Sequence, residues 1–140
     1  MKILLAVDGS DYTNRMLSYL TTHKEWSNAG HAFTVFHVVL PVPHRAAAFA
    51  GAEIVYGYYE DDARMVLEPV RDLLARNGIE ASFEHRVGHP AQEIASFAEK
   101  GRFDLVIMGS RGHGALAGLG RGAVATKVLA GCTVPVLLVR

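Results

Sequence analysis

Three glycines and two arginines follow an apolar segment, in an arrangement that favours phosphate binding. Gly109, Gly112 and Gly122 form the pattern Gly-x-x-Gly-x9-Gly, and Arg111 and Arg121 lie beside them. Glycines allow several backbone N–H groups to approach one anion, and the positive end of a following helix dipole stabilises negative charge. Arginine can add charge-assisted hydrogen bonds. The segment therefore predicts a phosphate-binding loop; a surface loop whose glycines only permit turns is the alternative.

A carboxylate follows the first apolar run of the chain. Asp8 comes directly after residues 3–7 and before Gly9 and Ser10, a sequence typical of a turn. A carboxylate can accept both hydroxyl protons of a ribose, so Asp8 is a candidate for binding the sugar of a nucleotide. The alternative is an aspartate that only ends a strand and starts a helix, and Ser10 can also cap that helix.

Apolar runs and helical spacing alternate along the chain. We expect strands at residues 3–7, 32–40, 79–87, 103–108 and 134–139, and helices at residues 11–23, 61–76, 90–100 and 122–130. Residues 41–59 show no clear period and are expected to form a mobile excursion, and a kink is expected near Pro69. This alternation predicts an α/β fold with a mostly parallel sheet and helices on both faces. With no internal repeat or linker, residues 1–140 are expected to form one domain.

The candidate residues fall where such sheets bind ligands. In open α/β sheets, ligands bind beyond the carboxyl ends of the strands, at the point where the strand order changes direction. Asp8, Val38 and Gly109 each lie at the expected carboxyl end of a strand. We therefore expect them to meet at one edge of the sheet.

Charge is balanced overall and uneven along the chain. Lys plus Arg and Asp plus Glu each number 14, which argues against the basic excess that nucleic-acid binding requires. After Asp104 the chain has no acidic residue and four basic ones, namely Arg111, Arg121, Lys127 and Arg140. This basic stretch also contains the glycine-rich loop. A small anion is therefore the expected ligand, and DNA or RNA is not.

The composition also bounds where the protein works. Cys132 is the only cysteine among 140 residues, so no intramolecular disulfide can form and a reducing compartment is expected. Cys132 itself is expected to be a small buried apolar residue. The apolar run at residues 3–7 is too short for a signal peptide, and no run approaches the roughly 18 residues of a membrane span. We expect a soluble, cytoplasmic protein without membrane contact.

Motifs for efficient catalysis are not found in the sequence. The pattern Gly-x4-Gly-Lys-Ser/Thr of P-loop hydrolases is missing, and Ser110 does not lie in a Gly-x-Ser-x-Gly elbow. The protein is therefore not expected to be an enzyme beyond slow ATP hydrolysis. The seven histidines show no convincing metal-ligand spacing. His113, beside the glycine loop, can contact a phosphate or respond to pH, or be an ordinary surface histidine.

Several segments together resemble the universal stress protein family, and the resemblance covers nearly the whole chain. The segments are Val7 to Ser10, His37 to Val39, Gly88 to Ile94, Asp104 to Gly112 and Val134 to Val139. The resemblance implies a three-layer α/β sandwich of the adenine nucleotide alpha hydrolase type, with a five-stranded parallel sheet of order 3-2-1-4-5. It also implies a homodimer formed largely through the last strands. One branch of the family binds ATP, with or without Mg²⁺, and the other binds none.

By this resemblance, an adenine nucleotide would lie between the first strand and the glycine loop. Asp8 would hold the ribose hydroxyls. The residues that would face the adenine or line the same cleft are Ala6, Val38, Met108 and Gly109. Those that would surround the phosphates are Arg111, Gly112, Gly122, Ala123 and Val124.

Ala123 departs from the motif of the ATP-binding branch, which has Ser or Thr after the last glycine. One side-chain donor to a phosphate is therefore missing. Such a hydrogen bond contributes about 0.5 to 1.5 kcal/mol when neutral and about 1.5 to 3 kcal/mol to a charged group, which predicts roughly ten- to hundredfold weaker binding. The backbone N–H of Ala123 remains available.

The last expected strand is apolar at every position and would lie at an edge of the sheet. A bare apolar edge promotes aggregation, and pairing with the same strand of a second subunit about a two-fold axis would cover it. The expected interface residues are Val134, Val136 and Leu138.

Two functions are compatible with the sequence. In the first, the protein binds ATP, or AMP or ADP, and acts as a dimeric switch that reports to a protein partner. In the second, it is a dimeric interaction module that has lost nucleotide binding and works through its surface and residues 41–59.

Overall fold

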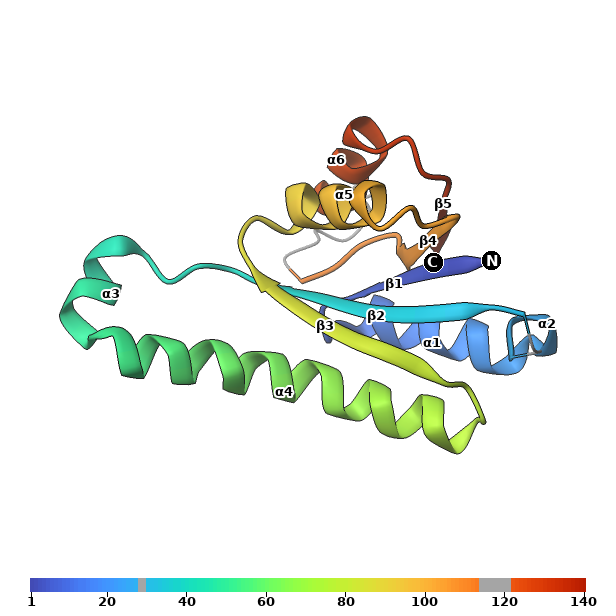
Figure 1. Ribbon diagram of the computed structural model, residues 1–140, viewed down its shortest axis with the longest axis horizontal. Helices are drawn as coiled ribbons and strands as arrows, with labels where there is room; N and C mark the ends of the chain where they lie inside the picture. The colour runs from blue at the N-terminus through green and yellow to red at the C-terminus, as the bar shows by residue number, and fades with distance from the viewer. Residues whose placement is uncertain (28–29, 114–121) are drawn as a thin grey trace.

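A five-stranded parallel sheet forms the centre of the computed structural model, which describes residues 1–27, 30–113 and 122–140 (Figure 1). The strand order is β3-β2-β1-β4-β5, and every neighbouring pair is parallel. The bounds are Lys2–Val7 for β1, Ala32–Val39 for β2, Ala81–Val87 for β3, Leu105–Gly109 for β4 and Val136–Val139 for β5. The expected order 3-2-1-4-5 is confirmed.

Helices cover both faces of this sheet, as Figure 1 shows, with α1 and α4 on one face and α5 and α6 on the other. The helices are α1 (Asp11–Thr22), α2 (Lys24–Ser27), α3 (His44–Ala50), α4 (Ala52–Arg76), α5 (Pro90–Lys100) and α6 (Ala123–Gly131). The expected three-layer α/β sandwich is thus confirmed. Among the described helices, none is both long and apolar enough to cross a bilayer.

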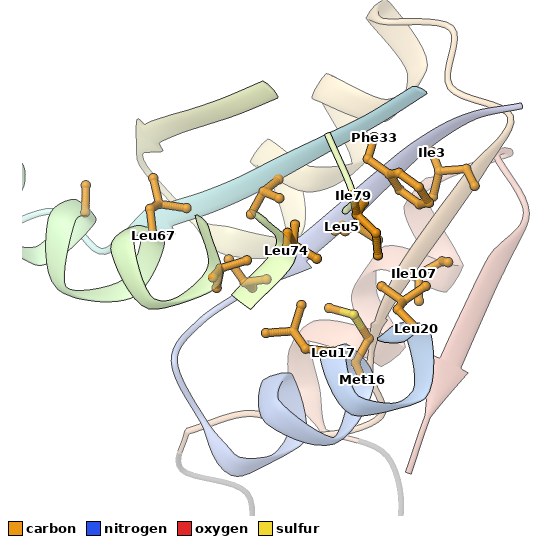
Figure 2. Packing of buried hydrophobic residues seen from close by; sticks show 14 of the residues in the cluster. Ile3, Leu5, Met16, Leu17, Leu20, Phe33, Leu67, Leu74, Ile79 and Ile107 are labelled. Atoms are coloured by element: carbon orange, nitrogen blue, oxygen red, sulfur yellow. The ribbon is translucent and has the colours of Figure 1, made fainter. Parts of the chain in front are cut away.

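Two hydrophobic clusters hold the layers together, one on each face of β1. Because successive side chains of a strand point to opposite faces, Leu5 belongs to the cluster under α1 and α4, and Leu4 to the cluster under α5 and α6. Burial on both faces explains why β1 reads as a continuous apolar run. The labelled side chains of the first cluster in Figure 2 are Ile3, Leu5, Met16, Leu17, Leu20, Phe33, Leu67, Leu74, Ile79 and Ile107. Burying each such side chain contributes about 1.5 to 3 kcal/mol.

Residues 41–59 correct one expectation, because they are mostly helical. They contain α3 and the first turns of α4, which begins at Ala52 and continues through Pro69. The amphipathic period was missing because α3 buries no side chain and α4 buries none before Ala63. A helical segment without fully buried side chains has no continuous apolar stripe for the sequence to reveal. In Figure 1 this part of the chain projects beyond the edge of the sheet.

Cys132 also differs from expectation, because it is partly exposed and not buried. Its partial burial raises the pKa of the thiol, and the nearby carboxylate of Glu99 acts in the same direction. The thiol therefore stays protonated at neutral pH, which fits the expectation of an unreactive cysteine.

Candidate functional site

A cavity of about 620 Å³ opens at the carboxyl ends of β1, β2 and β4. This is where the strand order changes direction, because β1 pairs with β2 on one side and with β4 on the other. All ten residues expected around a nucleotide line this one cavity: Ala6, Asp8, Val38, Met108, Gly109, Arg111, Gly112, Gly122, Ala123 and Val124. The fold thus brings together residues from three strands, the glycine loop and the start of α6.

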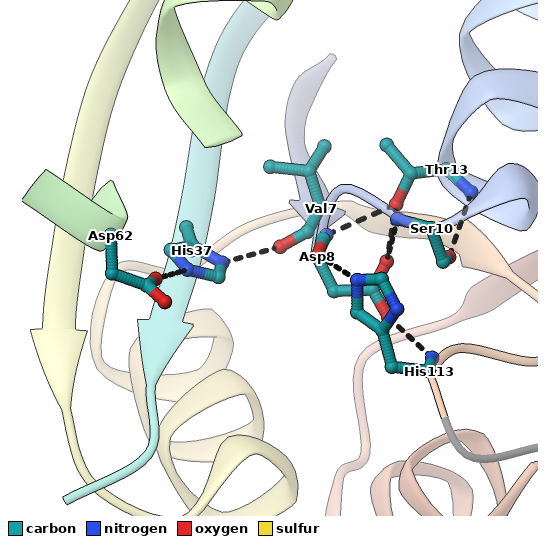
Figure 3. A network of polar contacts seen from close by, with 7 residues as sticks. All are labelled: Val7, Asp8, Ser10, Thr13, His37, Asp62 and His113. Atoms are coloured by element: carbon teal, nitrogen blue, oxygen red, sulfur yellow. Dashed lines mark hydrogen bonds and ion pairs between the residues drawn. The ribbon is translucent and has the colours of Figure 1, made fainter. Parts of the chain in front are cut away.

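Asp8 is held by a local network between β1 and α1 (Figure 3). Its Oδ1 accepts hydrogen bonds from the backbone N–H of Ser10, at 2.9 Å, and from the Thr13 hydroxyl, at 2.8 Å. Ser10 is also the N-cap of α1, because its hydroxyl accepts from the Thr13 N–H. The positive φ of Gly9, +79°, allows the chain to turn between Asp8 and the helix. The carboxylate is therefore fixed in orientation before any ligand arrives.

The same network sets the charge of Asp8. Burial would raise the pKa of Asp8, but hydrogen bonds from Ser10 and Thr13, together with the nearby His113, outweigh it. The pKa of Asp8 therefore lies below its ordinary value, and the side chain is a carboxylate at neutral pH.

His113 contacts Asp8 in two places. Its backbone N–H donates to Oδ2 of the Asp8 side chain at 3.3 Å, and its Nε2 lies 2.8 Å from the Asp8 carbonyl oxygen. Because a carbonyl oxygen can only accept, Nε2 is the protonated ring nitrogen. His113 therefore lines the cavity with Asp8 as its partner.

The three described glycines of the motif leave little or no room for a side chain. A Cβ on Gly112 would overlap Oδ2 of Asp8, and a Cβ on Gly109 would lie 2.8 Å from the Cβ of Tyr12. A Cβ on Gly122 would lie 3.1 Å from the Cα of Arg111. The loop therefore passes close to Asp8 along bare backbone, which is the arrangement that lets N–H groups cradle an anion.

The start of α6 faces the same cavity. Gly122 is the N-cap of this helix, without a side-chain cap hydrogen bond, and Gly122, Ala123 and Val124 all line the cavity. The free N–H groups at a helix start and the positive dipole end favour an anion there. Ala123 is exposed, and its methyl side chain offers no hydrogen-bond donor to the cavity.

Arg111 brings positive charge to the rim of the cavity. Its guanidinium donates to the Tyr12 hydroxyl at 3.5 Å and lies 5.9 Å from the centre of the Tyr12 ring. Arg15 lies 4.7 Å from the same ring. Arg121, the second arginine expected beside the loop, lies outside the described residues.

One wall of the cavity is formed by β2 and α4. Sequence reasoning indicated Val38 on β2, but it did not indicate that α4 completes this wall of the cavity. The wall adds His37, Leu40, Tyr58, Asp62, Met65 and Val66 to the cavity. His37 is 5% exposed, and its Nδ1 lies 2.9 Å from the Val7 carbonyl oxygen. Its Nε2 lies 2.7 Å from Oδ1 of Asp62 (Figure 3). The signal for His37 was its place at the expected end of a strand. Asp62 lies in the helix expected at residues 61–76, but no pattern indicated that it faces the cavity.

Within the described residues, no group of three or more His, Cys, Asp or Glu side chains is arranged to hold a metal ion. The described lining of the cavity combines two held carboxylates, Asp8 and Asp62, with glycine backbone, the start of α6 and the side chain of Arg111. This set can bind a molecule that combines hydroxyl or amine donors with an anionic group.

Comparison with known proteins gives the same picture along the whole sequence. A family model described as the Universal stress protein family matches residues 1–140. The universal stress protein YxiE of Bacillus subtilis is 29% identical, with 99% of this chain and 98% of that protein covered. A universal stress protein of Thermus aquaticus, named for its position beside a QAH/OAS sulfhydrylase gene, is 32% identical. The match covers 99% of this chain and 97% of that protein.

Solved structures share the fold. The universal stress protein UspA from Lactobacillus plantarum superposes with a TM-score of 0.81 at 17% identity, covering 100% of this chain and 97% of that chain. An Arabidopsis thaliana family member with AMP bound superposes with a TM-score of 0.70 at 16% identity. The match covers 99% of this chain and 90% of that chain. The Archaeoglobus fulgidus universal stress protein in complex with dAMP superposes with a TM-score of 0.67 at 22% identity. The match covers 100% of this chain and 98% of that chain. With a family model matched from the first residue to the last, the chain belongs to the universal stress protein family.

Proposed function

We propose that the protein binds an adenine nucleotide in the cavity at the carboxyl ends of β1, β2 and β4. The observation that carries the proposal is the contact between a fixed, charged Asp8 and the glycine loop at Gly112 within one cavity. A nucleotide requires an acceptor and an anion site next to each other. Its ribose hydroxyls donate hydrogen bonds, and its phosphates are attached to the same ribose. The related proteins with bound AMP and dAMP support this assignment.

Different lining residues would contact the ribose, the base and the phosphates. Asp8 accepts from the ribose hydroxyls. The apolar side chains of Ala6, Val38 and Met108 provide a surface for the base. The phosphates lie at the loop and the start of α6, where Arg111 and backbone N–H groups supply positive charge. ATP, with or without Mg²⁺, is the proposed ligand, and AMP and ADP are the alternatives.

The protein acts as a switch in this proposal, with at most slow hydrolysis. Nucleotide bound beside the glycine loop changes the surface offered to a protein partner, and this change needs no hydrolysis. The switch is a cytoplasmic homodimer joined through the edge strand β5, where Val136 and Leu138 are only half-buried. Pairing with a second β5 would cover both the strand edge and these side chains.

The melting temperature with and without millimolar ATP and Mg²⁺ tests the nucleotide site. A ligand at 100 times its dissociation constant stabilises the fold by about 2.7 kcal/mol, which corresponds to a shift of several degrees for a chain of this size. We expect this shift in the native protein and in Asp72→Ala, an exposed change on α4, and its loss in Asp8→Ala. A shift of equal size in Asp8→Ala would remove the cavity from consideration.

A second candidate function is favoured by the surface of α3 and α4. Six of the eight large apolar side chains that the described residues leave exposed lie between residues 40 and 65: Leu40, Phe49, Ile54, Tyr56, Tyr58 and Met65. Such a patch is typical of a protein–protein interface. The second candidate is therefore a dimeric interaction module that binds no nucleotide. It predicts no ATP-dependent shift in any of the three proteins.

A further inference from the structure

We propose that Asp62 selects the base of the nucleotide by accepting a hydrogen bond from its exocyclic amine. The inference rests on the proposed function, because it assigns a role to a second carboxylate in the same cavity. Asp62 lies on α4, whose place in the cavity wall no sequence pattern indicated. Three structural facts carry the assignment: the carboxylate is held, one of its oxygens is available, and its surroundings are apolar.

Asp62 is held by His37. Nδ1 of the ring lies 2.9 Å from the Val7 carbonyl oxygen, which can only accept, so Nδ1 carries a proton. Nε2 lies 2.7 Å from Oδ1 of Asp62, which is hydrogen-bonding distance. Because His37 is 5% exposed and bonded at both nitrogens, the ring cannot turn without losing both bonds. His37 is therefore a positioning residue that fixes the orientation of the Asp62 carboxylate.

The second oxygen of Asp62 is available to a ligand. In the part of the chain that the structure describes, no residue hydrogen-bonds to Oδ2. The α4 side chains that line the cavity around Asp62 are Tyr58, Met65 and Val66, which offer mainly apolar surface. A fixed acceptor in such a wall gives specificity, because a ligand without the matching donor leaves the acceptor unpaired.

The chemistry of an adenine nucleotide supplies one matching group. Its hydrogen-bond donors at neutral pH are the ribose hydroxyls and the exocyclic amine of the base. Asp8 and Asp62 are the carboxylates among the described residues that line the cavity. Asp8 lies against the loop and takes the hydroxyls, so Asp62 faces the remaining donor. The ligand class is thus a 6-aminopurine nucleotide; a 6-oxopurine would direct carbonyl lone pairs at the carboxylate and be disfavoured.

Two ligands that differ by the amine alone provide the test. ATP is compared with purine riboside 5′-triphosphate, which has hydrogen in place of the amine, by calorimetric titration. A hydrogen bond to a charged group accounts for roughly ten- to hundredfold in affinity. We expect the native protein to prefer ATP near the lower end of that range, because 33% of the Asp62 side chain is exposed to water. Asp62→Ala should bind both ligands with nearly equal affinity.

Asp61→Ala is the matched control. Asp61 is the neighbouring carboxylate on the same helix, but its side chain is 72% exposed and pairs with Arg64 at 3.4 Å, outside the cavity lining. Its removal changes the charge of α4 by the same amount, and the preference for ATP should persist. Because each protein is measured with both ligands, the ratio of the two dissociation constants is insensitive to a general loss of stability. If Asp62→Ala does not fold, Asp62→Asn keeps the volume and should still lower the ratio.

The outcomes separate this inference from the proposed function. Equal binding of both ligands by the native protein, or an unchanged ratio in Asp62→Ala, overturns the role of Asp62 and leaves the nucleotide site intact. No binding of either ligand at millimolar concentration overturns the proposed function and this inference with it. A ratio near ten or above that falls to about one only in the Asp62 variant supports both.

Discussion

Gly112 lies against the carboxylate of Asp8, so closely that a Cβ atom at residue 112 would overlap Oδ2. The two residues come from opposite ends of the chain and meet only because β4 pairs beside β1. This contact joins the candidate sugar-binding group to the candidate phosphate loop. The four predictions that follow test the site and the interface through single residues.

Gly112→Val should abolish the ATP-dependent rise in melting temperature, because the side chain would displace Asp8 or the loop. Gly57→Ala is the control, since nothing lies within 4 Å of a Cβ there and alanine favours the helix by roughly 0.5 to 1 kcal/mol. That variant should be slightly more stable and respond to ATP as the native protein does. An undiminished ATP response in Gly112→Val would show that the loop is not part of the site.

Ala123→Ser should tighten ATP binding by roughly tenfold or more, because it restores a hydroxyl donor at the start of α6. Ala123 is exposed, so the hydroxyl meets no steric obstacle from a packed core. Calorimetric titration with ATP and with adenosine separates the effect, since adenosine has no phosphate to receive the new bond. Equal tightening for both ligands would argue that the hydroxyl does not act on a phosphate.

Acid should remove the stabilising contribution of Asp8. Its pKa is lower in the folded chain than the ordinary value of 3.8, so the folded protein binds a proton less readily than the unfolded one. The contribution is then complete above pH 3.8 and is lost as the pH falls through the lower, folded value. In urea unfolding, the stability difference between the native protein and Asp8→Asn should be constant from pH 5 to 7 and shrink below pH 4. A difference that grows on acidification would contradict this sign.

Val136→Asp and Leu138→Asp should convert the proposed dimer to monomer or aggregate, measured as molar mass by light scattering after size exclusion. A charge on β5 opposes apolar pairing of the edge strand. Val87→Asp is the control, because Val87 is 40% exposed on the opposite edge strand β3 and lies outside the proposed interface. Dimers of unchanged mass in both β5 variants would place the interface elsewhere.

The fold was predictable because most of its strands are short apolar runs with sharp ends. Residues 3–7 and 106–108 are buried, and strands buried on both faces are continuous apolar runs in the sequence. Asp8, Val38 and Gly109 were predictable because they lie at strand ends, where the change in strand order gathers them. Arg111, Gly112 and Gly122 were predictable from the glycine pattern. Ala6, Met108, Ala123 and Val124 were indicated by the family resemblance.

The helical part of residues 41–59 and the contact of Asp62 with His37 were not predictable. Sequence periodicity reports burial, and α4 has no fully buried side chain before Ala63. Asp62 lies in the helix expected at residues 61–76, but its contact with His37 depends on how α4 lies over β2. When two residues meet only because separate elements pack together, the sequence around each of them shows no pattern that indicates the contact.

The overhang of α4 divides a single helix into two regions of different local stability. From Ala63 to Leu74 its side chains are locked into the core, whereas the preceding turns are attached to the sheet by the contacts of Glu60 with His85, at 3.6 Å, and of Asp62 with His37. Amide exchange should therefore be fast near Ala52 and slow down past Asp62. The boundary between the two regimes crosses the cavity wall, so a ligand that engages Asp62 would move it and lengthen the protected part of the helix.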